Sequence, residues 1–319
     1  MNLKPEFVER MKLLLDEKDY GLFYKTLDKP YFNSIRCNTL KISADELKQK
    51  LEKKWKIKQP LKEHPEIMVI ENHLEPGEIG KAPEHLLGYY YIQEISSMMP
   101  ALVLKPDKED NVLDLCASPG SKSTQIASMM ENKGVFIAND LSLDRIRILS
   151  TNAQRCGATN IMITQHDGIN LCARLSRIGF KFNKILVDAP CSGEGTLRLS
   201  PKTASMFNLN IIKKLSRTQK SLLSSALKIL KVGGEIVYST CTYAPEENEE
   251  VISYILDNFP VEIQEVKLPL KIREGIIEWQ GKKYNETVVK CARIYPHDNN
   301  TEGFFIAKLK KVGEIGVGE

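Results

Sequence analysis

Residues 111–130 read NVLDLCASPGSKSTQIASMM. The stretch consists of a short apolar run that ends in Asp114 and Cys116, a turn that contains Gly120, and a helical segment. A strand that is buried on both faces of a parallel sheet has near-continuous apolar residues, and a glycine turn into a helix is typical of a βα unit. We therefore predict a strand, a turn and a helix in this order.

The same apolar run that ends in aspartate or cysteine returns four times further along the chain. The runs are VFIAND (135–140), NIMITQHD (160–167), KILVDAPC (184–191) and EIVYSTC (235–241). FFIAKL (304–309) is predicted as a last strand, and a long amphipathic helix is predicted over 209–230, ended by Gly233–Gly234. Strands that alternate with helices predict a doubly wound, Rossmann-like α/β domain over 89–311, with a tail at 312–319.

Residues 1–88 show a different pattern. Helical stretches at 6–15 and 44–54, the second with Ser43 as its N-cap, alternate with short strand-like pieces such as SIRCNTLKI (34–42). We predict a smaller N-terminal α+β domain here.

The composition is that of a globular protein, with 319 residues, 42% hydrophobic and 27% charged, which is long enough for two domains. No apolar run approaches the roughly 18–20 residues of a membrane span, and acidic residues interrupt the segment that a signal peptide would need. The seven cysteines form no C-x-x-C pair and the five histidines are scattered. We expect a cytoplasmic, monomeric protein with reduced thiols, no metal and no membrane contact.

Acidic residues at the strand ends follow the glycine turn. Gly120 allows the backbone to approach a ligand, and the N-terminus of the next helix offers free N–H groups. The turn matches neither the dinucleotide nor the triphosphate pattern. Asp140 could accept two ribose hydroxyls and Asp167 could meet an adenine edge, although aspartates in such places are often only caps. An adenosine site without a phosphate cradle predicts S-adenosylmethionine (SAM) as the cofactor.

Two cysteines follow neighbouring predicted strands, in DAPCSGEGT (188–196) and STCTYAPEENEE (239–250). A single free cysteine is most often a small buried apolar residue. A thiolate that adds to C6 of cytosine, however, makes C5 able to attack a sulfonium methyl group. Asp188 is placed to give a proton to N3 of the base, and a second thiol could act when the first one leaves.

At these motifs the chain resembles the Sun-type (NSUN) RNA cytosine-5 methyltransferases. The resemblance covers about 270 residues and is carried by RCNTLK (36–41), GYYYIQEISSMMPALVL (88–104), DLCASPGSKS (114–123), DAPCSGEGTLR (188–198), YSTCTYAPEENE (238–249), RIYPH (293–297) and GFFIAKL (303–309). It implies a SAM-dependent methyltransferase fold and an enzyme like the archaeal ones that form 5-methylcytosine in tRNA.

The resemblance also implies roles for single residues. Cys241 would be the nucleophile and Cys191 would assist release of the product. The residues implied to contact SAM or its surroundings are Cys116, Ala117, Ser118, Pro119, Gly120, Ser121, Lys122, Asp140, Arg145, Asp167 and Asp188. The family's turn often has glycine where this chain has Ser121. We interpret PEENEE (245–250) as mainly a helix start favoured by the helix dipole, with Asn248 as a residue that could instead orient the Cys241 loop.

Two other functions remain as alternatives. A non-catalytic ribosome-assembly factor that binds SAM and RNA would keep the fold and the basic surface, but the presence of Asp188, Cys191 and Cys241 argues against it. A DNA cytosine methyltransferase would use Cys191 as its nucleophile, and the Thr-Cys motif argues against that.

Basic residues are concentrated between 170 and 220. This segment contains ten lysines and arginines but only two acidic residues, which gives it a net charge of +8. Such a cluster is typical of a nucleic-acid footprint, although a solvated helix face looks the same. We predict that Lys213, Lys214 and Arg217 bind RNA. Because the chain ends about ten residues after the last strand, we expect the target to be chosen by 1–88 and 170–220. A compact enzyme suits tRNA, with rRNA as the alternative.

Overall fold

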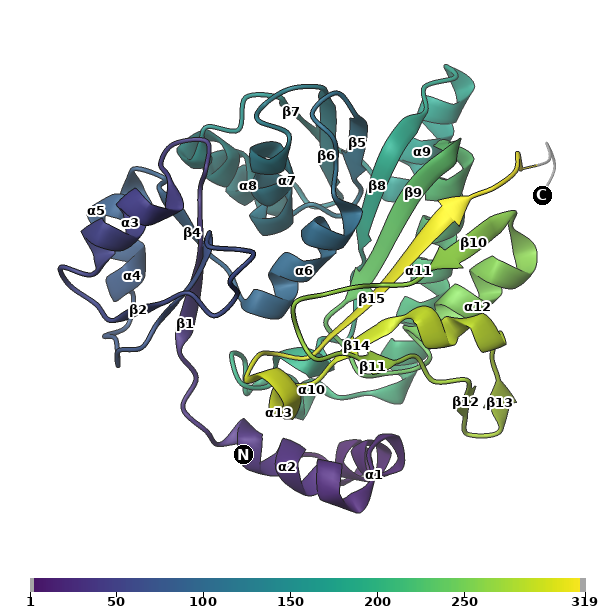
Figure 1. Ribbon diagram of the computed structural model, residues 1–319. Helices are drawn as coiled ribbons and strands as arrows, with labels where there is room; N and C mark the ends of the chain where they lie inside the picture. Colours follow the sequence, from purple (N-terminus) through teal and green to yellow (C-terminus); the bar gives the residue numbers. More distant parts are fainter. Residues whose placement is uncertain (1–2, 316–319) are drawn as a thin grey trace.

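The computed structural model describes residues 3–315 as a small antiparallel sheet beside a large mixed sheet (Figure 1). The small sheet has the order β2-β3-β1-β4, with bounds β1 (Asn33–Cys37), β2 (Ile57–Lys58), β3 (Ile67–Ile70) and β4 (Tyr90–Ile92). Its helices are α3 (Ala44–Leu51), α4 (Glu78–Lys81) and α5 (Pro83–Leu86). Ser43 accepts a hydrogen bond from the Glu46 N–H in a capping box, which confirms the predicted N-cap.

The first two helices do not pack on the small sheet. α1 (Pro5–Leu14) and α2 (Glu17–Leu27) bury Phe7 and Phe23 against Tyr243 and other apolar residues of the large domain. The small sheet takes in β4, which lies past the boundary that we predicted after residue 88. We therefore propose a domain boundary after Ile92.

The large sheet has the order β11-β14-β15-β9-β8-β5-β6-β7, and β10 pairs with β15. Its parallel part consists of β5 (Asn111–Asp114), β6 (Val135–Asp140), β7 (Ile161–Gln165), β8 (Phe182–Asp188) and β9 (Leu230–Thr240). Its antiparallel part consists of β10 (Val261–Gln264), β11 (Arg273–Glu274), β14 (Ala292–Ile294) and β15 (Phe304–Lys311). The predicted α/β class is confirmed, and the antiparallel strands extend the parallel sheet at one edge.

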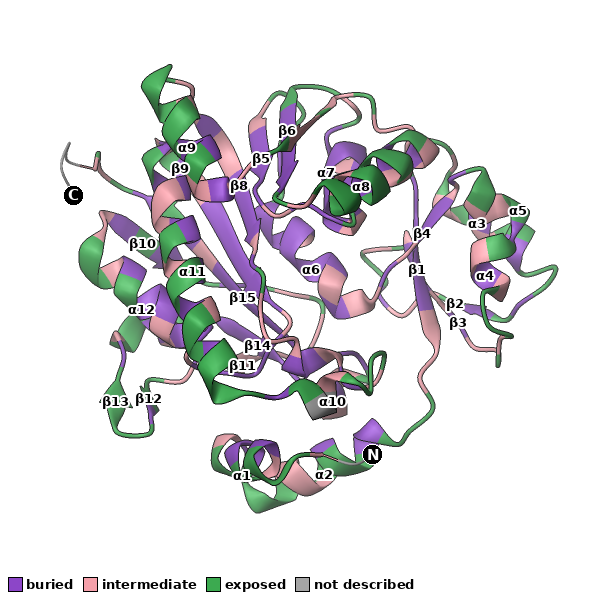
Figure 2. Cartoon of the chain, turned by 180° about the vertical axis from the view of Figure 1, so that it is seen from behind, coloured by how far each residue is buried: buried purple, intermediate pink, exposed green. Residues whose placement is uncertain are grey.

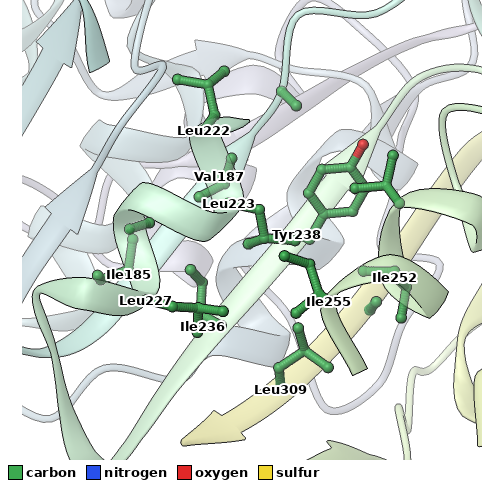
Figure 3. Packing of buried hydrophobic residues seen from close by; sticks show 14 of the residues in the cluster. Ile185, Val187, Leu222, Leu223, Leu227, Ile236, Tyr238, Ile252, Ile255 and Leu309 are labelled. Atoms are coloured by element: carbon green, nitrogen blue, oxygen red, sulfur yellow. The ribbon is translucent and has the colours of Figure 1, made fainter. Parts of the chain in front are cut away.

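Helices cover both faces of this sheet (Figure 2). One face carries α6 (Ile95–Leu104), α7 (Ser121–Met129) and α8 (Leu143–Cys156). The other carries α9 (Gly168–Arg177), α11 (Leu209–Lys228) and α12 (Glu249–Asn258). Successive strand residues point to opposite faces of the sheet. Leu186 of β8 packs with the buried residues under α6 and α7, whereas Ile185 and Val187 pack with those under α11 and α12 (Figure 3). Both faces are therefore buried, as the apolar strands predicted.

Short elements complete the chain. They are α10 (Thr203–Met206), η1 (Glu194–Thr196), the β12 (Glu278–Trp279) and β13 (Lys282–Lys283) hairpin, η2 (Glu286–Lys290) and α13 (Pro296–Asn299). The predicted tail begins after β15, and residues 316–319 of it lie outside the described range.

The predicted end of the long helix was wrong. α11 ends at Lys228, and Gly233 and Gly234 lie inside β9. Gly233 has φ 82°, and the pairing of β9 with β8 shifts register between Phe182 and Lys184. The two glycines therefore form an irregularity in a strand, where positive φ is required, rather than a helix stop.

Candidate functional site

The glycine turn is held by backbone and side-chain contacts. Gly120 has φ 101°, and a Cβ there would lie 2.8 Å from Leu149 Cδ1, so only glycine fits. The Ser118 N–H donates to Asp140 Oδ2 over 3.2 Å, and Arg145 donates to the Ser118 carbonyl over 2.7 Å. The turn therefore approaches the end of β6 closely, as its predicted role in cofactor binding requires.

A cavity of about 340 Å³ lies beside this turn. It is lined by Leu115, Cys116, Ser118, Asn139, Asp140, Leu141, Arg145, Asp167, Gly168, Asp188, Ala189, Pro190, Cys191, Thr218, Leu222 and Cys241. Asp167 caps α9 by accepting from the Asn170 N–H over 3.0 Å, and Asp140 accepts from the Ser142 N–H over 3.1 Å. Asp167 is thus both a helix cap and a cavity wall, and Asp140 holds the turn before α8 while it lines the same cavity.

The donor set of this cavity fits SAM. Its lining includes the carboxylates of Asp140, Asp167 and Asp188, which can accept hydrogen bonds as ribose hydroxyls require, and the apolar side chains of Leu115, Leu141 and Leu222, which can cover an adenine ring. Arg145 is the only basic side chain among the lining residues, and it is already bound to the Ser118 carbonyl and faces Asp140. This is not a polyphosphate site, in agreement with the sequence pattern.

A second cavity, of about 380 Å³, opens between β4, α6 and the ends of β8 and β9. Its lining residues are Tyr91, Ile92, Gln93, Glu94, Ser97, Asp114, Cys116, Ala117, Ser118, Pro119, Ser121, Lys122, Asp188, Thr196, Leu199, Cys241, Glu302 and Phe304. The two cavities share Cys116, Ser118, Asp188 and Cys241. A group bound in one cavity can therefore meet a group bound in the other at Asp188 and Cys241.

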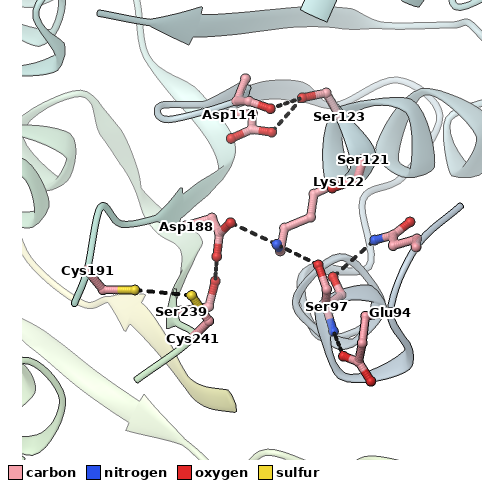
Figure 4. Close-up of polar contacts among 12 residues, drawn as sticks. Glu94, Ser97, Asp114, Ser121, Lys122, Ser123, Asp188, Cys191, Ser239 and Cys241 are labelled. Atoms are coloured by element: carbon pink, nitrogen blue, oxygen red, sulfur yellow. Dashed lines mark hydrogen bonds and ion pairs between the residues drawn. The ribbon is translucent and has the colours of Figure 1, made fainter. Parts of the chain in front are cut away.

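Asp188 lies at the centre of a polar chain (Figure 4). Its Oδ2 accepts from Lys122 Nζ over 2.7 Å, and its Oδ1 accepts from Ser239 Oγ over 2.7 Å. Lys122 Nζ also donates to Ser97 Oγ over 2.9 Å. The carboxylate is thereby fixed in place by the helix after the glycine turn, by α6 and by the end of β9.

The two predicted cysteines face each other across the ends of β8 and β9. Their Sγ atoms are 3.3 Å apart, and all seven cysteines are free thiols. The hydrogen bond to Cys241 and burial raise the pKa of the Cys191 thiol well above its ordinary value. Either thiol can donate the hydrogen bond in this contact, so the geometry brings the two sulfurs together without assigning the proton.

Nearby titratable groups are also shifted by burial. Burial raises the pKa of Asp114 to about 7, and the pKa of the Cys116 thiol also rises, chiefly because it is buried. Cys116 is thus a wall of the site rather than a second nucleophile.

Several side chains of the site were not predicted. Arg36, from β1 of the small domain, donates to the Ser121 carbonyl over 2.7 Å and to Thr124 Oγ1 over 2.9 Å. It holds the start of α7 from the side of the other domain. Ser97 and Ser239 were also missed. Arg36 and Ser97 lie in the segments that carry the family resemblance, but single residues within those segments have no pattern that reveals a partner distant in the sequence.

The predicted RNA-binding residues lie on the exposed side of α11. Lys213, Lys214 and Arg217 are exposed, and the next residue, Thr218, reaches the first cavity. Other basic residues of 170–220 are paired with acids outside that segment, in the ion pairs Lys181–Glu314, Lys184–Glu235 and Lys220–Glu250. The charge of the segment is therefore smaller at the surface than its sequence indicates.

Among residues 3–315, the structure has no helix with the length and apolar character needed to cross a bilayer. The same residues contain no group of three or more histidine, cysteine or acidic side chains that could hold a metal ion.

The chain matches two protein-family models. Residues 101–310 match the 16S rRNA methyltransferase RsmB/F family, and residues 3–95 match the N-terminal domain of 16S rRNA methyltransferase RsmF. The chain is 42% identical to tRNA (cytosine(49)-C(5))-methyltransferase of Pyrococcus abyssi, over 98% of this chain and 99% of that protein. It is 36% identical to ribosomal RNA small subunit methyltransferase F of Vibrio cholerae, over 99% of this chain but only 65% of that protein.

Solved structures resemble the chain over nearly its whole length. A methyltransferase homologue from Pyrococcus horikoshii has a TM-score of 0.81 at 34% identity and covers 97% of this chain and 100% of that one. NSun6 from Pyrococcus horikoshii with SFG has a TM-score of 0.83 at 27% identity, with 98% and 99% covered.

Proposed function

The chain belongs to the 16S rRNA methyltransferase RsmB/F family of SAM-dependent RNA methyltransferases, and from this premise we propose that it forms 5-methylcytosine in tRNA through a covalent bond between Cys241 and C6 of the base. The observation that carries the proposal is the pair of thiols, 3.3 Å apart, at the junction of the two cavities and beside Asp188. A non-catalytic binding protein would have no use for this arrangement.

The first cavity would hold SAM and the second would admit the cytosine. When bound, SAM supplies an electrophilic methyl group. Asp140 would accept hydrogen bonds from the ribose, and Asp167 would lie near the adenine edge. A cytosine flipped out of its stack enters the second cavity, because both its face and its edge must be reached.

The attack uses three side chains. Cys241 Sγ gives up its thiol proton to water and adds to C6, and the electron pair of the C5–C6 double bond moves toward C4 and N3, which then needs a proton. Asp188 passes this proton to N3, and Lys122, whose Nζ lies 2.7 Å from Asp188 Oδ2, can replace the proton on the carboxyl group. The addition leaves C5 nucleophilic toward the methyl group.

Release needs a second group. The proton on C5 must leave, the double bond must form again and the Sγ–C6 bond must break, with its electron pair returning to Cys241. Two thiols so close together cannot both lose their protons, because the two negative charges would repel each other. Once Cys241 is bonded to C6 this repulsion is gone, so Cys191 can lose its own proton to water and accept the proton from C5.

The full-length match to the Pyrococcus abyssi enzyme supports tRNA as the target. The matches to ribosomal RNA methyltransferases favour rRNA as a second candidate. The two are separated by incubating the protein with SAM and either unmodified tRNA or 16S rRNA, followed by bisulfite mapping of resistant cytosines. Methylation of tRNA alone is the expected result. Methylation of rRNA alone would show that rRNA, and not tRNA, is the target.

The roles of the two cysteines are tested by single substitutions. Cys241→Ser should abolish methyl transfer and form no adduct, because a serine hydroxyl ionises far less readily than a thiol. Cys191→Ala should methylate once and then stall as an RNA–protein adduct that survives a denaturing gel. An adduct in the Cys241 variant only would reverse the roles, and full turnover in both variants would refute the mechanism.

A further inference from the structure

Two consecutive residues beneath the cysteines are fully buried, although the sequence indicated a helix start. Glu247 and Asn248 are both 0% exposed, and α12 begins only at Glu249. The preceding residues form turns that fold back under the loops of Cys191 and Cys241. Burial of a carboxylate and an amide is costly unless their hydrogen bonds are made, so the contacts of these two side chains indicate their purpose.

Asn248 holds the residues on both sides of Cys241. Its Nδ2 donates to the Thr242 carbonyl over 3.0 Å, and its Oδ1 accepts from Thr240 Oγ1 over 2.6 Å. One planar amide therefore holds the Thr240 side chain before the nucleophile and the Thr242 backbone after it.

Glu247 and its partner Gln219 hold the residues on the two sides of Cys191. Glu247 Oε2 accepts from the Ser192 N–H over 3.1 Å and from Gln219 Nε2 over 2.8 Å. The same Gln219 Nε2 donates to the Pro190 carbonyl over 2.9 Å. The turn that carries Cys191 is thus fixed from below by Glu247 directly and by α11 through Gln219.

Besides the contact of the two sulfurs, further hydrogen bonds join the two cysteine loops. Ser192 Oγ and Thr242 Oγ1 are 2.8 Å apart, and the Gly195 N–H donates to the Cys241 carbonyl over 2.8 Å. Tyr238 Oη donates to the Glu247 carbonyl over 2.5 Å, which ties the backbone of residue 247 to β9. Each cysteine loop nevertheless has a separate side-chain partner in PEENEE (245–250): Asn248 contacts the Cys241 loop and Glu247 contacts the Cys191 loop.

We propose that Glu247 and Asn248 are positioning residues for the two separate steps of the reaction. Asn248 orients Cys241 for its attack on C6, and Glu247, together with Gln219, holds Cys191 in place for release of the product. This proposal rests on the proposed covalent mechanism, and it predicts that damage at two adjacent positions blocks different steps.

The experiment compares Glu247→Ala, Glu247→Gln and Asn248→Ala in the full chain. Adduct formation is followed on denaturing gels, single-turnover methyl transfer is measured with labelled SAM, and multiple turnover is measured separately. Glu247→Ala should keep methyl transfer, lose turnover by about 10²-fold and accumulate the adduct, since small misplacements of catalytic groups have effects of this size. Asn248→Ala should lose adduct formation and methyl transfer together.

The glutamine variant separates geometry from charge. An amide oxygen can accept from both Ser192 and Gln219, so Glu247→Gln should restore turnover. Glu250→Ala is the matched control, because Glu250 belongs to the same motif but pairs with Lys220 and Lys282 instead. Its turnover should equal that of the unmodified protein. SAM binding, measured by calorimetry, shows which variants are folded. If Glu247→Ala is not folded, Gln219→Ala takes its place, and this variant should also accumulate the adduct.

The outcomes are distinct. Equal loss of both steps in the Glu247 and Asn248 variants, or failure of Glu247→Gln to restore turnover, overturns the positioning roles. Absence of an adduct even in Cys191→Ala contradicts the covalent mechanism itself and not these roles alone.

Discussion

Asp140 is the residue that tests the cofactor cavity most directly. Its side chain is buried and accepts from the Ser118 and Ser142 N–H groups, which leaves further lone pairs for a ligand. We expect Asp140→Ala to weaken SAM binding by about 1–3 kcal/mol, because hydrogen bonds to a buried charged acceptor are lost. Calorimetry measures this change. Asp144→Ala, in an exposed position nearby on α8, is the control, and equal affinity in both variants would exclude Asp140 as a cofactor contact.

At the residue scale, the sequence was informative where function follows a strand end. Asp140, Asp188, Cys191 and Cys241 could be singled out because parallel strands bring their carboxyl ends to one edge. The residues that hydrogen-bond to these groups or hold their loops could not be singled out from the sequence. Arg36, for example, reaches the glycine turn from a position 85 residues earlier, and only the packing of two domains makes that contact.

Among the elements, α11 joins the predicted RNA surface to the cofactor cavity. Lys213, Lys214 and Arg217 are exposed, and Thr218 lines the cavity. Replacement of all three basic residues by alanine should weaken RNA binding and reduce the slope of log affinity against log salt by about 3 at most, since each phosphate contact contributes about 0.7–0.9. Filter binding over a salt series measures the slope, and SAM binding should stay unchanged.

A matched control uses lysines away from the cavities. Lys267 and Lys283 do not line either cavity, and Lys283 lies on the β12–β13 hairpin (Figure 1). Their replacement should leave the salt slope unaltered. If the α11 variant also keeps its slope, the RNA binds elsewhere.

The boundaries of elements were predictable where an apolar run ends in a polar residue. β6 begins and ends at the predicted residues 135 and 140. The end of α11 was not predictable in this way, because a glycine pair after a helix is compatible both with a helix stop and with an irregularity in a strand. Ile229 is the C-cap of the helix, and Leu230 already pairs with Phe182 of β8, so the strand begins before Gly233.

At the scale of the whole molecule, the first two helices pack against the large domain and not against the small sheet. Arg10 of α1 forms an ion pair with Glu246 over 2.7 Å, next to the residues that hold the cysteine loops. An amphipathic helix shows that it covers an apolar surface but not which one. We therefore placed the predicted helix at 6–15 in the N-terminal unit and made no prediction for 17–27, whereas α1 and α2 both pack against Tyr243 and Tyr295 of the large domain.

Buried carboxyl groups make the stability of the whole molecule depend on pH. Burial raises the pKa of Asp114 and of Glu194 to about 7, and it raises the pKa of Glu302 to about 8. These values exceed those of the unfolded chain, which are about 4, so the folded state binds more protons between them. The stability contributed in this way is present at lower pH and is lost as the pH rises through the folded-state values.

We therefore expect the free energy of unfolding to fall by about 1–2 kcal/mol between pH 7 and pH 8, with Glu302 as the largest contributor. Urea unfolding at the two pH values measures the change. Glu302→Gln is the informative variant, because an amide oxygen can still accept from the Leu199 N–H, which now lies 2.7 Å from Oε1, but does not titrate. The variant should lose less stability over this interval than the unmodified protein. An equal loss in both would mean that Glu302 is already ionised in the folded state at pH 7.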